Sequence, residues 1–158
     1  MTGRAGARKV LSVQAGTGRL LIGYGNELRG DDAAGPVLVR EAMAWRLPEV
    51  ECLVTHQLTP ELADPISRCR EVVFVDATAG EGPGWRAVGP QAGQKALGHA
   101  CQPEELLALA QALYGRAPQG WLLGLPAVEF GFGEALSAAA QEGLEQGRKM
   151  LREKLAGG

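Results

Sequence analysis

Residues 20–35 read LLIGYGNELRGDDAAG, and their order indicates the architecture of the whole chain. The stretch opens with a short apolar run, which is typical of a buried strand. It then turns through Gly25 and Asn26, two residue types that tolerate backbone conformations with positive φ. A helical pattern begins at the adjacent carboxylates Asp31 and Asp32. A strand, a glycine turn and a helix start in this order predict the carboxyl edge of a parallel sheet, where α/β proteins place their sites.

Three interpretations of this acidic turn remain open. A dinucleotide-binding fingerprint would need a third glycine where the chain has Leu28, and two carboxylates would repel a pyrophosphate at the helix N-terminus. A helix cap needs only one carboxylate, so this interpretation explains either Asp31 or Asp32 and leaves the other aspartate without a role. The third interpretation is a site where a carboxylate faces a cation or a reacting group.

The motif Gly23-Tyr24-Gly25-Asn26-x-Leu28-x-x-Asp31-Asp32-x-x-Gly35 resembles the opening motif of the hydrogenase maturation proteases. These endopeptidases remove a C-terminal extension from the large subunit of nickel-iron hydrogenases. The resemblance extends from Leu20 to the final helix and includes HQLTPEL at 56–62 and EFGFGE at 129–134. It implies a peptidase, classified with the aspartic type, whose partner is the precursor of a hydrogenase large subunit.

Composition places the chain among ordinary globular proteins. Its 158 residues are 46% hydrophobic and 22% charged, which fits one domain, expected over 18–158 after a flexible Gly-rich extension at 1–17. The net charge of −2 is not the strongly basic charge that is typical of proteins that bind nucleic acid. No apolar run approaches the roughly 20 residues of a membrane span. Three cysteines without metal-ligand spacing, and no secretory signal, favour a cytoplasmic location.

Strand and helix patterns alternate along the chain. A helix is expected after Asp31, and others are expected to begin near Thr59, Pro103 and Ser137. The run EVVFVDA, from Glu71, is the strongest strand and reads as buried on both faces. The predicted strands lie at 18–24, 51–54, 71–77, 85–88 and 121–125. The pattern predicts an α/β fold, a three-layer α/β/α domain with a mainly parallel twisted sheet of about five strands.

Two acidic residues follow strands that we expect to be neighbours. Asp32 comes after the first strand and Asp76 ends the third, so both are expected at one crevice, with His99 in a following loop. Two carboxylates and an imidazole suit a first-row divalent metal. Taken singly, Asp76 also fits a turn residue and His99 a solvated loop histidine. His56 is either an additional ligand or a surface residue.

The resemblance assigns roles to these positions. It implies that Asp32, Asp76 and His99 contact the metal, with Asp32 and Asp76 as the catalytic carboxylates. Gly25 and Asn26 would shape the supporting loop, and Asp31 would cap or support the adjacent helix. The metal would be nickel recognised on the substrate, so the free protein need not hold any.

Other functional classes remain as alternatives. One is a nickel-sensing maturation chaperone that uses the same ligands without catalysis, and another is a nucleotide-binding Rossmann-like module. A cysteine nucleophile would have to be Cys101, two residues from His99. The chain lacks both G-x-S-x-G and H-E-x-x-H, which argues against a serine hydrolase of that type and against a zincin.

Overall fold

The computed structural model describes residues 18–79, 82–92, 101–133 and 135–157. These residues build a five-stranded sheet in the order β2-β1-β3-β5-β4. β1 pairs in parallel with β2 and β3, and β3 pairs in parallel with β5. β4 lies antiparallel to β5 at the edge. The strands are β1 Arg19–Tyr24, β2 Val50–Thr55, β3 Glu71–Thr78, β4 Gly84–Val88 and β5 Gln119–Pro126.

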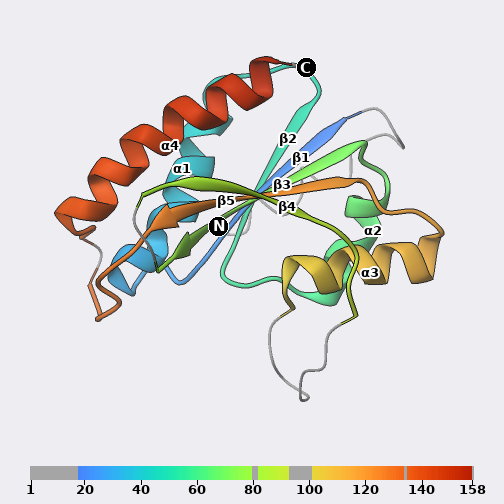
Figure 1. Ribbon diagram of the computed structural model, residues 1–158, viewed down its shortest axis with the longest axis horizontal. Helices are drawn as coiled ribbons and strands as arrows, with labels where there is room; N and C mark the ends of the chain where they lie inside the picture. The colour runs from blue at the N-terminus through green and yellow to red at the C-terminus, as the bar shows by residue number, and fades with distance from the viewer. Residues whose placement is uncertain (1–17, 80–81, 93–100, 134, 158) are drawn as a thin grey trace, which may run out of the picture.

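Helices cover both faces of the sheet, which confirms the predicted three-layer arrangement (Figure 1). One face carries α1, Ala34–Met43, and α4, Ala138–Ala156. The opposite face carries α2, Ala63–Ser67, and α3, Pro103–Tyr114. Two short 3₁₀ turns, η2 Gly30–Ala33 and η3 Pro60–Leu62, precede α1 and α2. None of the described helices combines the length and hydropathy that crossing a membrane requires.

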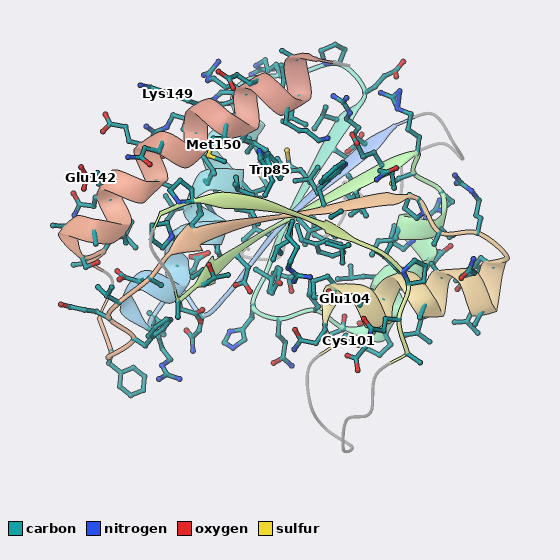
Figure 2. The ribbon with its side chains drawn as sticks, in the orientation of Figure 1. Trp85, Cys101, Glu104, Glu142, Lys149 and Met150 are labelled. Carbon is teal, nitrogen blue, oxygen red and sulfur yellow. The ribbon has the colours of Figure 1, made fainter. Side chains whose placement is uncertain are left out.

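The central strand β3 shows why the chain needs two helical layers. Val72 and Phe74 point into the apolar cluster under α2 and α3, and Val73 and Val75 point into the cluster under α1 and α4. All four side chains are fully buried, as the unbroken apolar run predicts. On the α4 side, Trp85 of β4 and Met150 of α4 pack against the second cluster (Figure 2).

The order of the strands places a topological switch point between β1 and β3. The chain leaves β1, returns through α1 to β2 on one side, and then places β3 on the other side of β1. The connections after neighbouring strands β1 and β3 therefore diverge, and such a divergence leaves room for a site at the carboxyl edge. The sequence prediction that the strands ending near Asp32 and at Asp76 are neighbours is confirmed.

Two helix starts differ from the expectation. The turn η2 separates Asp31 and Asp32 from α1, whose N-cap residue Ala33 has no capping side chain. Thr59 precedes Pro60 as expected, but its side chain makes no capping hydrogen bond. In contrast, the Ser137 hydroxyl accepts the Ala140 N–H at 3.1 Å and caps α4 as predicted. The predicted extension at 1–17 lies outside the described residues.

Candidate functional site

The loop after β1 closes onto Asp32. The backbone N–H of Asn26 donates to Asp32 Oδ2 at 2.6 Å. Gly25 has φ 148°, and a Cβ placed there would lie 2.1 Å from the carbonyl oxygen of Asp32. Only glycine fits such a contact without moving the backbone. Gly25 and Asn26 therefore hold Asp32 in place. This hydrogen bond and close backbone contact are the physical basis of the supporting role expected from the sequence.

Asp76 lies beside this loop, near the carboxyl end of β3. Because Gly23 of β1 is in register with Val75 of β3, the next residues along the two strands, Tyr24 and Asp76, meet at the edge of the paired region. The phenol hydroxyl of Tyr24 is hydrogen-bonded to the Asp76 carboxylate. Asp32 is close enough for its charge to act on Asp76. The structure thus brings the two predicted carboxylates together.

Burial raises the pKa of Asp76 to about 6, since a carboxylate loses solvation there. Hydrogen bonds from Tyr24 and from the backbone of Ala77 favour the ionised form, while the negative charge of Asp32 opposes it. A carboxyl group with a pKa near neutrality can both accept and return a proton under ordinary conditions. Two carboxylate groups therefore lie together at this site, and they are the groups here that can take part in acid–base chemistry.

Tyr24 is a site residue that sequence reasoning missed: the glycine motif includes it, but the pattern assigned it no role of its own. Its ring lies edge-on to Phe74, with centroids 6.5 Å apart, and it packs against the apolar cluster under α2 and α3. Burial, and then the negative charge of Asp76, raise the pKa of the phenol above its ordinary value, so it remains a hydrogen-bond donor. The sequence did carry one signal for this role: a polar aromatic residue ends a strand that was expected to be buried.

Of the two roles expected for Asp31, capping the adjacent helix is wrong, because its carboxylate is used elsewhere. Asp31 is fully buried, and Oδ2 accepts the backbone N–H groups of Val128 at 2.8 Å and Glu129 at 3.0 Å. Oδ2 also accepts the Ser137 hydroxyl at 2.7 Å, and Oδ1 accepts the Ser137 N–H at 2.8 Å. Burial alone would raise the pKa of Asp31, but these hydrogen bonds outweigh it and lower the pKa. Asp31 is therefore an ionised clamp on the loop after β5.

The third expected metal ligand, His99, lies outside the described residues. His56 is described: it is exposed and follows the end of β2. Across the described part of the chain, no three His, Cys, Asp or Glu side chains gather into a group that could hold a metal ion. His56 therefore does not complete a ligand set with Asp32 and Asp76 in this arrangement. The pairing of Cys101 with His99 also falls outside the described residues.

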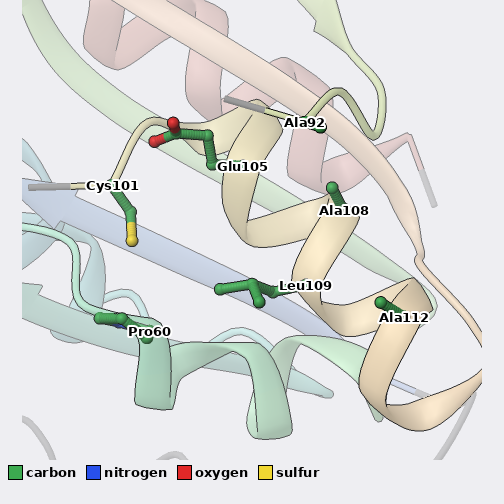
Figure 3. A pocket seen from close by; sticks show the side chains of 7 residues that line it. All are labelled: Pro60, Ala92, Cys101, Glu105, Ala108, Leu109 and Ala112. Atoms are coloured by element: carbon green, nitrogen blue, oxygen red, sulfur yellow. The ribbon is translucent and has the colours of Figure 1, made fainter. Parts of the chain in front are cut away.

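A separate hollow of about 470 Å³ lies between η3 and α3 (Figure 3). Its wall is mainly carbon, and Glu105, its one ionisable carboxylate, accepts the backbone N–H of Gln102 at the start of α3. Neither Asp32 nor Asp76 lines it. The side chains around it are Pro60, Ala92, Cys101, Glu105, Ala108, Leu109 and Ala112. The hollow is therefore separate from the aspartate pair at the sheet edge.

No protein-family model and no curated protein sequence matches the chain. Several solved structures do match the chain. The nickel-iron hydrogenase maturation protease HycI from Thermococcus kodakarensis superimposes with a TM-score of 0.64 at 26% identity, over 95% of this chain and 98% of that one. In fold and extent, this chain is similar to the hydrogenase maturation proteases. The resemblance found in the glycine motif is confirmed.

Two further structures support the same fold. The hydrogenase maturating endopeptidase HybD from E. coli has a TM-score of 0.69 at 17% identity, over 88% of this chain and 92% of its own. A hydrogenase 2 maturation peptidase from a Thaumarchaeota archaeon has a TM-score of 0.62 at 21% identity, over 87% and 97%. The three-layer α/β/α domain is thus that of the maturation proteases, and the aspartate pair lies at its carboxyl edge.

Proposed function

We propose that the protein is a peptidase of hydrogenase maturation, an endopeptidase that removes the C-terminal extension of a nickel-iron hydrogenase large-subunit precursor after nickel insertion. The observation that carries the proposal is that Asp32 and Asp76 lie near each other at the carboxyl ends of β1 and β3, in a fold shared with proteins named maturation proteases. Catalysis by this carboxylate pair, an aspartic-type arrangement, belongs to the same proposal.

The two carboxylates would divide the work. Asp76, with a pKa of about 6, would take a proton from an attacking water and return it to the leaving amine. Asp32, fixed by the Asn26 N–H, would orient the reacting group. Tyr24 would hold Asp76 in place through its hydroxyl.

Nickel would enter as part of the substrate. Carboxylate and imidazole groups are suitable donors for a first-row divalent ion. Asp32 and Asp76 supply two carboxylates at one place, and His99 would supply the imidazole. Three protein donors leave coordination positions for the precursor's own ligands. The site would then distinguish a precursor that carries nickel from one that does not.

The decisive experiment is to incubate the purified protein with nickel-loaded precursor and to measure the mass of the product. A product shortened at the C-terminus is expected with the loaded precursor and not with nickel-free precursor. Asp32→Asn should abolish this cleavage. Asp64→Asn is the matched control, because Asp64 lies on α2 with a half-exposed side chain paired with Arg68 at 3.5 Å; it should cleave normally.

The outcomes separate the alternatives. Binding of loaded precursor without any mass change would indicate a nickel-sensing chaperone. Equal cleavage of loaded and nickel-free precursor would remove the nickel-recognition role while leaving the peptidase. A nucleotide-binding module is disfavoured because Gly25 closes directly onto Asp32, so carboxylate and backbone fill the place of a phosphate.

A further inference from the structure

The described surface carries a group of apolar side chains beside the aspartates. Large hydrophobic residues are exposed at seven described positions, and four of them lie on two neighbouring segments. Phe132 is 90% exposed, Val128 60%, Leu28 56% and Phe130 39%. Monomeric domains rarely leave such a concentration of aromatic and aliphatic side chains in water without a binding role. We call these four residues the Phe132 patch.

Backbone hydrogen bonds hold the two segments of the patch side by side. The Gly30 N–H donates to the Gly133 carbonyl at 2.9 Å, and the Gly133 N–H donates to the Leu28 carbonyl at 2.9 Å. The Asp31 N–H donates to the Glu129 carbonyl at 2.7 Å. Gly30, with φ 55°, allows this approach, because a Cβ there would lie 2.6 Å from the Glu129 carbonyl oxygen. The backbone beneath the patch is thus preformed, which lowers the entropic cost of binding.

The patch is continuous along the chain with the candidate active site. Leu28 lies between Asn26, which donates to Asp32, and Asp31, which clamps Val128 and Glu129. The loop that carries Asp32 therefore also carries Leu28 of the patch, and Asp31 of that loop holds the segment that carries the rest of it. The hydrogen-bonded backbone of the two segments therefore positions both Asp32 and the apolar side chains of the patch.

Charges around the patch favour an apolar occupant. The Arg29 guanidinium donates to the Phe130 carbonyl at 3.0 Å, and Glu27 forms an ion pair with Arg40. The exposed Glu129 carboxylate balances the charge of Arg29, so the described residues of the two segments present no dominant charge of one sign. Exposed aromatic side chains on a fixed backbone are typical anchors of protein interfaces.

We propose that the Phe132 patch binds apolar side chains of the precursor segment that carries the cleaved bond. This inference rests on the proposed function for the identity of its occupant. The contact would orient the scissile segment across Asp32 and Asp76, and it would contribute to substrate affinity rather than to the chemical step.

The test measures cleavage kinetics of nickel-loaded precursor with Phe132→Ser and with the control Leu113→Ser. Leu113 is 62% exposed, near the end of α3 that leads to the start of β5, so it lies at the opposite edge of the sheet. Phe132→Ser should raise KM at least tenfold with kcat within twofold, and should leave the Tm unchanged. Leu113→Ser should match the wild type. Equal KM values for Phe132→Ser and the wild type, or an equal loss in Leu113→Ser, would overturn the proposal.

A binding measurement separates this inference from the proposed function. Fluorescence anisotropy of labelled precursor should show weaker binding to Phe132→Ser and wild-type binding to the control Leu113→Ser. If the wild type cleaves nothing, the proposed function fails, and the same binding comparison still decides the patch. Sedimentation of the protein alone provides the last check: a wild-type dimer that Phe132→Ser converts to monomer would identify the occupant as a second copy and overturn the proposal.

Discussion

At the scale of single residues, Asp31 and Asp76 have opposite environments. Asp31 is fully buried and receives hydrogen bonds from four donor groups, which lower its pKa. Asp76 is largely buried with fewer donors, so burial prevails and its pKa rises to about 6. The first is suited to hold structure as a permanent anion, and the second to exchange protons.

Asp31→Asn should destabilise the protein, although it preserves the size of the side chain. An amide carries no charge and turns one acceptor oxygen into a donor facing N–H and O–H groups. We expect a loss of about 3 kcal/mol in the free energy of unfolding, the scale for charge-assisted hydrogen bonds left unmade in a buried place. Urea unfolding checks this, with Asp64→Asn as the control expected to change little. Activity retained at wild-type stability would contradict the clamp role.

Asp76→Asn should change how stability depends on pH in the metal-free protein. A carboxyl group has a pKa of about 3.9 in the unfolded chain, and Asp76 has about 6 in the folded one. The folded state therefore binds the proton more tightly. This contribution is fully present below pH 4 and is lost as pH rises through 6, by roughly 2–3 kcal/mol.

Asp76→Asn lacks this loss because its amide does not titrate. The variant should become more stable relative to the wild type between about pH 4 and pH 7. Denaturant unfolding at several pH values gives the difference directly. Parallel stability curves for the two proteins over this interval would show that Asp76 is not desolvated in solution.

At the scale of elements, three segments at the carboxyl edge carry or hold the aspartates. The loop after β1 carries Asp32, the end of β3 carries Asp76, and the loop after β5 is tied to the first by the Asp31 clamp. Ser137 links that third loop to α4, since its hydroxyl donates to Asp31 and accepts from Ala140. The position of the aspartates therefore depends on contacts between loops rather than on one loop alone.

Gly25→Ala should displace the loop after β1. Its φ of 148° is strained for any L side chain, and the added methyl group would meet the Asp32 carbonyl oxygen. We expect a loss of about 3 kcal/mol in stability, and cleavage of nickel-loaded precursor should fall with it. The control is Gly84→Ala, because a Cβ at Gly84 meets no atom within 4 Å. A fully active, fully stable Gly25→Ala protein would rule out the tight closure of this loop onto Asp32.

At the scale of the whole molecule, two apolar clusters hold the domain, one on each face of the sheet. Phe74 and Ile66 belong to one cluster, and Val75 and Leu151 to the other. All four are fully buried. The described residues thus build a core of ordinary composition, and the site lies at its rim.

Removal of metal should leave the fold intact. Domains that need a metal to fold lack an adequate apolar core and unfold with a chelator. This chain has such a core on both sheet faces. We expect the Tm with and without excess EDTA to agree within about 1 °C, as measured by circular dichroism. A fall of several degrees, restored by nickel, would instead indicate a resident structural metal.

Local patterns in the chain were sufficient to predict the layers. The apolar run from Val72 to Val75 predicts a strand buried on both faces, and the structure has it. Ser137 before a helical stripe predicts the cap of α4. The aspartates at strand ends follow from the same reading, because a parallel sheet brings its carboxyl ends to one edge. These features depend on periodicity and on residues a few positions apart, which a sequence displays directly.

The partners of Asp31, Tyr24 and Phe132 required the folded chain. Asp31 binds groups 97 to 106 residues away, and Tyr24 meets Asp76 only because β1 lies beside β3. Phe132 joins Leu28 in one patch through the backbone bonds of Gly30 and Gly133. Hydrogen bonds and apolar contacts depend on distance in space. Only the packing of the sheet and its loops brings these residues within reach, so their roles are properties of the tertiary structure.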